Sequence, residues 1–354
     1  MSLPRAAIAT PAADALMIGG LSILGMGTIL VALLFFGVQV GFVEGDWIAI
    51  TILVNSTHFM ASYRLLYVSK SEVLANRWSA IFVPVLLVGI YLFAAFGSER
   101  DRTFEVLVLL SSIYLAWHYT GQAWGMVATF GHIVGIRFAS WERRCIRAGM
   151  RALLALHVLY ALSGRLPPSE WIAPARYIAV YNGLFQIVCG AAALGLLAGA
   201  LAYGSTWRRH GHLPIRCVLP WLALFFWYPF WYFVPGGFLW VQLSHALQYL
   251  PFPLRIDANR YAAAAPRTPL EKRRRTLLAY LCLVVAGAAI LNGAPLAAHL
   301  FGEGWYSSPD ARVLFIAFTN CVAIHHYFID GAVWKLRNEK VRQELFRHLE
   351  VRTA

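Results

Sequence analysis

Six of the eleven histidines of this chain lie inside long apolar segments: His58, His118, His157, His245, His325 and His326. An imidazole ring can bind a metal ion, carry a proton or pair with another polar group. Within a bilayer an ionisable side chain is costly, so such residues mark functional sites by default. We therefore interpret these histidines, together with Asp330, as the residues that carry chemistry.

Four of these histidines lie at a similar depth. His58, His245 and His325 each precede a basic residue by about 10 to 12 positions, and His118 lies 13 residues before Gly131. At a rise of 1.5 Å per residue, all four are expected roughly 15–20 Å above the cytoplasmic rim. Four crossings would thus deliver imidazole to one layer near the midplane, which predicts a shared metal or cofactor site.

The predicted metal ligands are His58, His118, His245 and one or both of the adjacent His325 and His326. Neighbouring residues on a helix point about 100° apart, so the adjacent pair cannot face the same way. One of the two is expected to bind the metal, while the other binds a partner or lines the pocket.

Amide side chains accompany these ligands. Asn55, Gln122 and Gln248 each lie three or four residues from a predicted ligand, on the same helical face. A metal-bound histidine usually donates its second ring N–H to a carboxylate or amide oxygen, so the three amides are predicted to support the bound metal or cofactor. The alternative for any single pair of histidine and amide is that its hydrogen bonds only hold neighbouring helices together.

Asp330 and Tyr327 are the predicted catalytic residues. Asp330 lies one helical turn after His326 and is expected to be a ligand, a hydrogen-bond acceptor for a ligand or a proton relay. Tyr327 belongs to a group of aromatic residues around the histidine layer that could form an apolar pocket, with ordinary packing as the alternative. His157 has no amide nearby and is predicted to be structural.

The elements that hold these residues are predicted to be transmembrane helices. Apolar residues make up 59% of the 354 residues and charged residues 13%, against roughly 45–50% and about 25% in ordinary globular proteins. We predict an all-α fold, a polytopic bundle of about ten helices forming one integral membrane domain over residues 1–354. The apolar segments are 15–38, 47–68, 79–97, 104–131, 149–164, 173–203, 218–234, 237–250, 277–297 and 313–334.

Loops rich in Lys and Arg alternate along the chain with poor or acid-balanced ones. The poor loops are 41–46, 97–103, 165–176, the turn at Pro235 and 299–310. By the positive-inside rule, this alternation predicts both termini in the cytoplasm and a location in the cell membrane, the inner membrane of a bacterium. The net charge of +13 then reflects cytoplasmic loops beside membrane lipids and not a nucleic-acid partner.

Histidines that converge from several helices near the midplane resemble the arrangement in two groups of non-haem iron enzymes. One comprises the bacterial membrane β-carotene cleavage dioxygenases, and the other the membrane desaturases and alkane hydroxylases. The strings THFMASYRLLY, WHYTGQAWG, HALQYLPFPLR and HHYFIDGAVWKLRN lack the HxxxH and HxxHH boxes of the latter group. The resemblance is therefore one of arrangement, and no catalytic residue is carried over from it.

Three functions are compatible with these features. The leading hypothesis is an oxidoreductase whose metal ion, expected to be iron, binds O₂ beside an apolar substrate and hydroxylates, desaturates or cleaves it, with an electron-donor protein as a possible partner. The second is a haem protein with two axial imidazoles. The third is a transporter or proton channel with a relay of histidines and Asp330.

Overall fold

The computed structural model describes residues 6–37, 48–97, 100–163, 173–264, 268–302, 308–334 and 339–350, and every element in these ranges is helical. In chain order the elements are α1 (Pro11–Ala15), η2 (Leu16–Gly20), α2 (Leu21–Phe36), η3 (Thr51–Ser56), α4 (Thr57–Leu66), α5 (Lys70–Ala75), η4 (Trp78–Phe82), α6 (Val83–Phe96), α7 (Arg100–Ile133), α8 (Ser140–Leu162), α9 (Pro174–His210), η5 (Ile215–Cys217), α10 (Leu219–Phe233), α11 (Gly237–Tyr249), α12 (Pro251–Ala264), α13 (Pro269–Leu291), α14 (Gly293–Phe301), α15 (Pro309–Val333) and α16 (Glu339–Glu350).

Six helical stretches among the described residues are long and apolar enough to cross a membrane: Pro11–Phe36, Trp78–Phe96, Ser140–Leu162, Pro174–His210, Arg273–Leu291 and Pro309–Val333. Their outer surfaces are apolar as well. On α9, for example, Ile187, Leu194 and Leu201 recur every seven residues and are 68%, 69% and 72% exposed. A face of this kind is compatible with a hydrocarbon environment.

The other predicted crossings are also helical, but they are shorter or more polar. Helices α10 and α11 contain 15 and 13 residues, whereas a crossing needs about 20. The η3–α4 stretch, α7 and α11 carry His58, His118 and His245, and polar site residues lower the mean hydropathy of the helix that holds them. The total of about ten crossings therefore stays a prediction.

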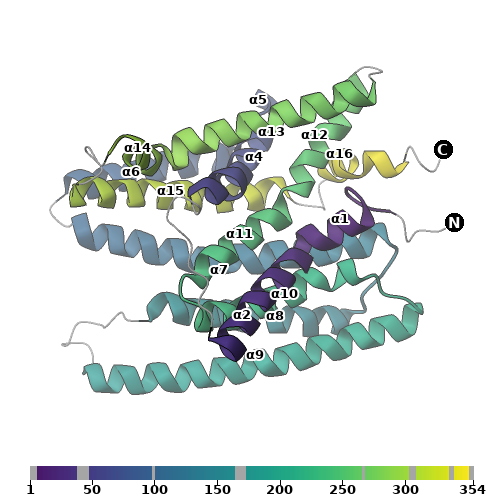
Figure 1. Ribbon diagram of the computed structural model, residues 1–354, viewed down its shortest axis with the longest axis horizontal. Coiled ribbons are helices and arrows are strands. Elements are labelled where there is room, and N and C mark those ends of the chain that lie inside the picture. Colours follow the sequence, from purple (N-terminus) through teal and green to yellow (C-terminus); the bar gives the residue numbers. More distant parts are fainter. Residues whose placement is uncertain are drawn as a thin grey trace.

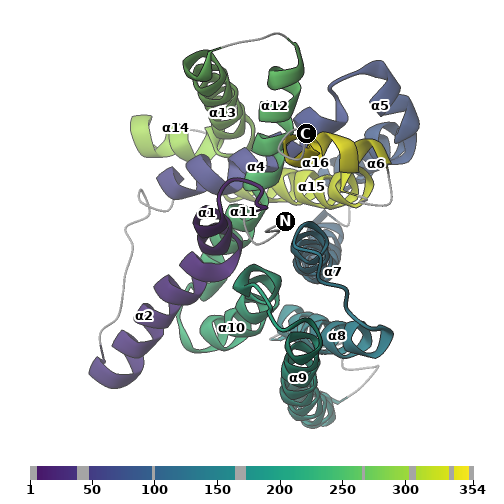
Figure 2. The same cartoon turned by 90° about the vertical axis from the view of Figure 1, so that its right-hand side faces the viewer.

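The helices that carry the site lie side by side in the middle of the bundle (Figures 1 and 2). Helix α15 packs against α4, α6 and α7, and α7 packs against α8 and α10. Helix α11 packs against α4, α10 and α2. Four segments that are far apart in the sequence thus surround one interior region.

Small residues permit the closest helix contacts. A Cβ at Gly149 of α8 would lie 2.9 Å from the carbonyl oxygen of Gly195 on α9, and a Cβ at Gly195 would lie 2.5 Å from the Cα of Gly149. Any larger side chain would push the two backbones apart. Glycine-to-glycine contacts of this type are typical of helices that associate in membranes.

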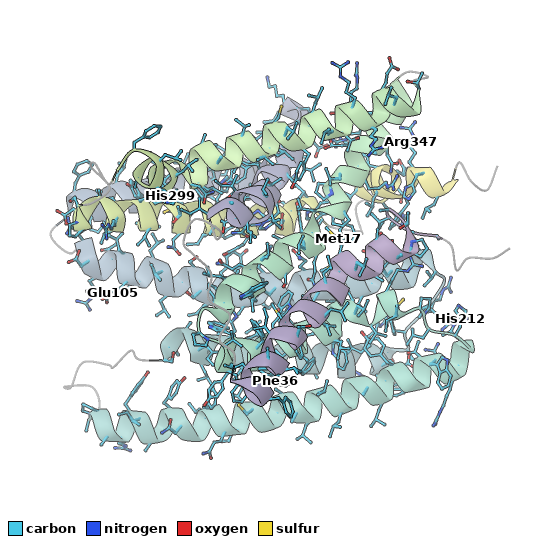
Figure 3. The ribbon with its side chains drawn as sticks, viewed as in Figure 1. Met17, Phe36, Glu105, His212, His299 and Arg347 are labelled. Carbon is cyan, nitrogen blue, oxygen red and sulfur yellow. The ribbon has the colours of Figure 1, made fainter. Side chains whose placement is uncertain are left out.

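The described chain begins and ends near the same end of the bundle, where its first residues and helix α16 lie (Figure 1). His212 and Arg347 lie at this end as well, whereas Glu105 and His299 lie toward the opposite end (Figure 3). The placement of the two termini relative to a membrane stays a prediction. The predicted external loop 41–46 and most of the loop 165–176 lie outside the described residues.

Candidate metal centre

Four imidazole rings meet in the interior of the bundle, and each comes from a different helix. His58 lies on α4, His118 on α7, His245 on α11 and His326 on α15. The Nε2 atoms of His58 and His326 are 3.1 Å apart, and those of His118 and His245 are 3.0 Å apart. All four side chains are buried.

Each of these two spacings is one that two ligands of the same metal ion would have. Imidazole nitrogens bind at ~2.0–2.1 Å from an ion of the size of zinc, so two neighbouring ligand nitrogens lie about 2.9 Å apart at octahedral angles and about 3.4 Å apart at tetrahedral angles. Both measured Nε2–Nε2 distances fall in that interval. Ring centroids of neighbouring members lie 4.7 to 5.2 Å apart, with the rings nearly edge to face.

Asp330 adds a carboxylate to the four rings. Its Oδ2 lies 3.7 Å from the Nε2 of His118 and 3.5 Å from the Nε2 of His326. Its Oδ1 accepts hydrogen bonds from the Ser62 hydroxyl at 2.6 Å and the Tyr249 hydroxyl at 3.2 Å. Two groups of three could each hold an ion, with ligand atoms within 4.8 Å of one another: His58, His245 and His326, and His118, His326 and Asp330.

A polar residue follows each of the four histidines at a spacing of four residues. The partners are Ser62 after His58, Gln122 after His118, Tyr249 after His245 and Asp330 after His326. Residues at this spacing share a helical face one turn apart. Ser62 and Tyr249 both donate to Asp330, and their hydroxyl oxygens lie 2.5 Å apart, so three of the four partners form one connected polar layer next to the imidazoles.

The tautomer of His58 is fixed by its own helix. Its Nδ1 donates a hydrogen bond to the backbone carbonyl oxygen of Asn55 at 2.6 Å. The Nε2 lone pair therefore points at the centre, as a metal ligand requires. The contact from Asn55 comes from its backbone carbonyl, whereas the sequence predicts this role for the side-chain amide.

The two glutamines have different hydrogen-bond partners. The side-chain nitrogen of Gln122 donates to the backbone carbonyl oxygen of His245 at 3.1 Å, which ties α7 to α11 beside the centre. The side-chain nitrogen of Gln248 donates to the backbone carbonyl oxygen of Ile18 at 2.8 Å. Both bonds end on backbone carbonyls and not on an imidazole ring. Gln122 therefore acts on the position of His245, and Gln248 on the packing of η2.

The adjacent histidines of α15 separate as the helical angle requires. His326 enters the centre, while the Nε2 of His325 donates to the backbone carbonyl oxygen of Ser79 at 2.7 Å. The Nδ1 of His325 then accepts a hydrogen bond from the Tyr63 hydroxyl at 2.8 Å. Both nitrogens of His325 are thus occupied outside the centre, and the structure does not bring this predicted ligand to the other four.

His157 also lies outside the centre. Its Nδ1 is 3.2 Å from the Tyr228 hydroxyl, and its ring packs between Tyr119 and Trp231. Its Nε2 is buried without a hydrogen-bond partner among the described residues. These contacts agree with the structural role that the sequence predicts.

Aromatic rings cover the imidazoles. Phe59 stacks on His326 with ring centroids 4.2 Å apart, and Tyr327 stacks on His118 at 4.7 Å. Tyr119 packs against His245 at 4.5 Å. These contacts restrict the orientations of the three imidazole rings. Tyr327 contacts one of the candidate ligands directly, which keeps it close to any reacting group.

A cavity of about 260 Å³ borders the centre. His118 and Asp330 form part of its wall. Most of the remaining wall is apolar or aromatic, including Tyr114, Trp117, Met126, Phe252, Tyr327, Trp334 and Leu345. The centre is therefore accessible from a space that suits an apolar ligand.

Sequence reasoning missed several residues of the site. Ser62 and Trp334 lie in the network around Asp330, since the Trp334 indole N–H donates to the Tyr249 hydroxyl at 2.6 Å. Both could have been found by a spacing of four residues, from His58 to Ser62 and from Asp330 to Trp334. Nothing in the sequence marks Ser79, which contributes only a backbone carbonyl to His325.

No protein-family model matches this chain, and neither a curated protein nor a solved structure shows significant similarity to it. The properties of the centre therefore rest on its own geometry.

Proposed function

We propose that this protein is a membrane-embedded, metal-dependent oxidoreductase that acts on an apolar substrate at the four-histidine centre. The observation that carries the proposal is the convergence of four imidazoles and one carboxylate beside an apolar cavity. A buried cluster of five polar side chains is costly to maintain in an apolar interior, and binding a metal ion would satisfy it.

The ligand set favours iron among the metals that a membrane oxidoreductase uses. Imidazole suits zinc, copper, iron and nickel, and a carboxylate added to histidines is a ligand combination of non-haem iron enzymes. Such an ion, when bound, would supply O₂ chemistry. The chain itself would hold the ion through His58, His118, His245 and His326, position Asp330 through Ser62 and Tyr249, and exclude water with the aromatic cover.

The spacing of the imidazoles favours a bare ion over haem. Two axial imidazoles would place their nitrogens ~4 Å apart across the iron, twice a bond of ~2.0–2.1 Å. The facing pairs here are only 3.0 and 3.1 Å apart. Moreover, a macrocycle inserted between one pair would collide with the other pair, because neighbouring ring centroids lie within 5.2 Å.

Hydroxylation, one of the oxidations that the centre could perform, needs O₂ and a source of electrons as co-substrates. Hydroxylation of a C–H bond by O₂ consumes two electrons and two protons, and it yields an alcohol and one water. An electron-donor protein is therefore part of the proposal.

Purified protein in lipid nanodiscs tests the proposal by elemental analysis, a visible spectrum and O₂ consumption with a reductant and an apolar substrate. We expect stoichiometric iron, no Soret band and substrate-dependent O₂ uptake. A Soret band would favour the haem hypothesis. Absence of metal, combined with pH-driven flux in liposomes, would favour a transporter.

A further inference from the structure

The cavity beside the centre is elongated along one face of α7. Its wall on this helix includes a row of residues three or four positions apart, from Tyr114 through His118, Gln122 and Met126 to Thr129. At 1.5 Å per residue, the 15 positions from Tyr114 to Thr129 correspond to about 22 Å. A length of this size combined with a volume of about 260 Å³ describes a narrow groove.

Three glycines form part of the groove wall: Gly121 and Gly125 on α7 and Gly331 on α15. A Cβ added at any of them would meet no heavy atom within 4 Å. Close packing between helices therefore does not require glycine here, although glycine within a helix costs about 1 kcal/mol relative to alanine. Their effect is to leave the groove open.

The polar groups of the groove concentrate near its middle. His118 and Asp330 face it from the metal centre, and the side-chain oxygen of Gln122 is buried without a hydrogen-bond partner among the described residues. The end with Tyr114 and Trp117 is mainly apolar, whereas the other end combines Phe252 and Leu345 with Thr129. A chain threaded through the groove would pass the centre along its length.

The distance from the centre to one end of the groove matches one leaflet of a bilayer. His118 and Thr129 are 11 positions apart, which corresponds to about 16 Å along α7. Half of a hydrocarbon core of ~30 Å is ~15 Å. A lipid whose polar end lies at the bundle end that carries α12 and α16 would therefore reach the centre with the distal part of its chain.

From this geometry we infer that the groove binds the unbranched hydrocarbon chain of a one-chain amphiphile, such as a long-chain fatty acid, with its polar end near Thr129 and its distal carbons at His118. That the bound chain is oxidised rests on the proposed function. That the chain binds rests on the groove alone. The volume lies just below the ~300–1,000 Å³ of typical drug-sized pockets, which fits one chain and excludes a bulky ring system.

Photolabelling with palmitic acid that carries a diazirine tests the inference in nanodiscs. A diazirine near the chain terminus should label residues around His118, and a diazirine near the carboxyl group should label residues around Thr129, Phe252 or Leu345. Excess unlabelled palmitate should abolish both signals. The reverse order of labelling, or label spread over the outer surface of α9 that palmitate does not displace, would overturn the inference.

A matched pair of glycine variants tests the groove itself. Gly125→Leu fills the groove, whereas Gly190→Leu adds the same side chain on exposed α9, where a Cβ also meets no heavy atom. We expect Gly125→Leu to reduce photolabelling by about tenfold or more, and Gly190→Leu to leave it unchanged. Equal labelling in both variants would overturn the inference.

Metal content of the same samples separates the two proposals. If wild-type protein is photolabelled specifically but binds no metal, the proposed metal centre is refuted and the proposed lipid groove stands. If the protein binds metal but shows no photolabelling that palmitate displaces, the proposed lipid groove is refuted and the proposed metal centre stands.

Discussion

His58 and His326 face each other through their Nε2 atoms at 3.1 Å, although 268 positions separate them in the chain. The contact joins α4 to α15, and the pair of His118 and His245 joins α7 to α11 in the same way at 3.0 Å. The two pairs are neighbours, because the ring centroids of His58 and His245 lie 5.2 Å apart, as do those of His118 and His326.

The adjacent histidines of α15 form a matched pair for testing ligation. We expect His326→Ala to lose stoichiometric metal, because it removes a nitrogen at the centre, and His325→Ala to retain it, because both nitrogens of His325 bond elsewhere. Metal content of the purified variants, read by elemental analysis, gives the answer. If only His325→Ala lost metal, the metal would bind on the face of α15 that carries His325, and the assignment of His326 as a ligand would be wrong.

The other three imidazoles should behave like His326. His58→Ala, His118→Ala and His245→Ala should each lower metal content strongly, since each leaves an open coordination position. His157→Phe serves as the control, because His157 is equally buried but packs with aromatic residues outside the centre. If His157→Phe removed the metal while His58→Ala retained it, the four-histidine centre would be refuted.

Variants of Asp330 and Ser62 distinguish the effect of the carboxylate charge from the effect of a hydrogen bond that positions the carboxylate. Asp330→Asn keeps the shape but removes the negative charge beside His118 and His326, so we expect metal affinity to fall by ~10–100-fold. Ser62→Ala removes one hydrogen bond to the carboxylate and should have a smaller effect in the same direction. Chelator competition measures both affinities. An unchanged affinity in Asp330→Asn would exclude the carboxylate from the site.

The two glutamines should differ in the property that they affect. Gln248→Ala removes the bond to the Ile18 carbonyl and should lower the free energy of unfolding by ~1–3 kcal/mol, because it leaves a buried acceptor unsatisfied. Gln122→Ala removes the link to the His245 backbone and should lower metal affinity instead. Thermal unfolding and metal titration of both variants distinguish the two roles, and a reversed pattern would contradict this assignment.

Cysteine accessibility tests the predicted orientation. His212 and His299 are both exposed and lie toward opposite ends of the bundle (Figure 3). In a background without the five native cysteines, a membrane-impermeant maleimide added to intact cells should label His299→Cys directly. It should label His212→Cys only after the membrane is opened. Labelling of both from outside would overturn the predicted topology.

The sequence by itself determined the all-helical class and predicted that histidines from different helices lie in one layer. Depth along a helix follows from a fixed rise of 1.5 Å per residue, so the positions of His58, His118 and His245 relative to the helix ends were enough to predict one shared layer. The apolar runs likewise indicated membrane-spanning helices, and six of them are long and apolar enough to cross.

Only the tertiary structure decided which atoms meet in that layer. The rotation of each helix about its axis and the partners of its polar groups are set by packing against neighbours, which a single segment does not encode. For this reason the sequence left His325 and His326 as alternatives and assigned a side-chain role to Asn55, whose backbone carbonyl is the group that holds His58. The contact between Ser62 and Asp330 likewise joins two helices, and it exists because packing brings α4 against α15.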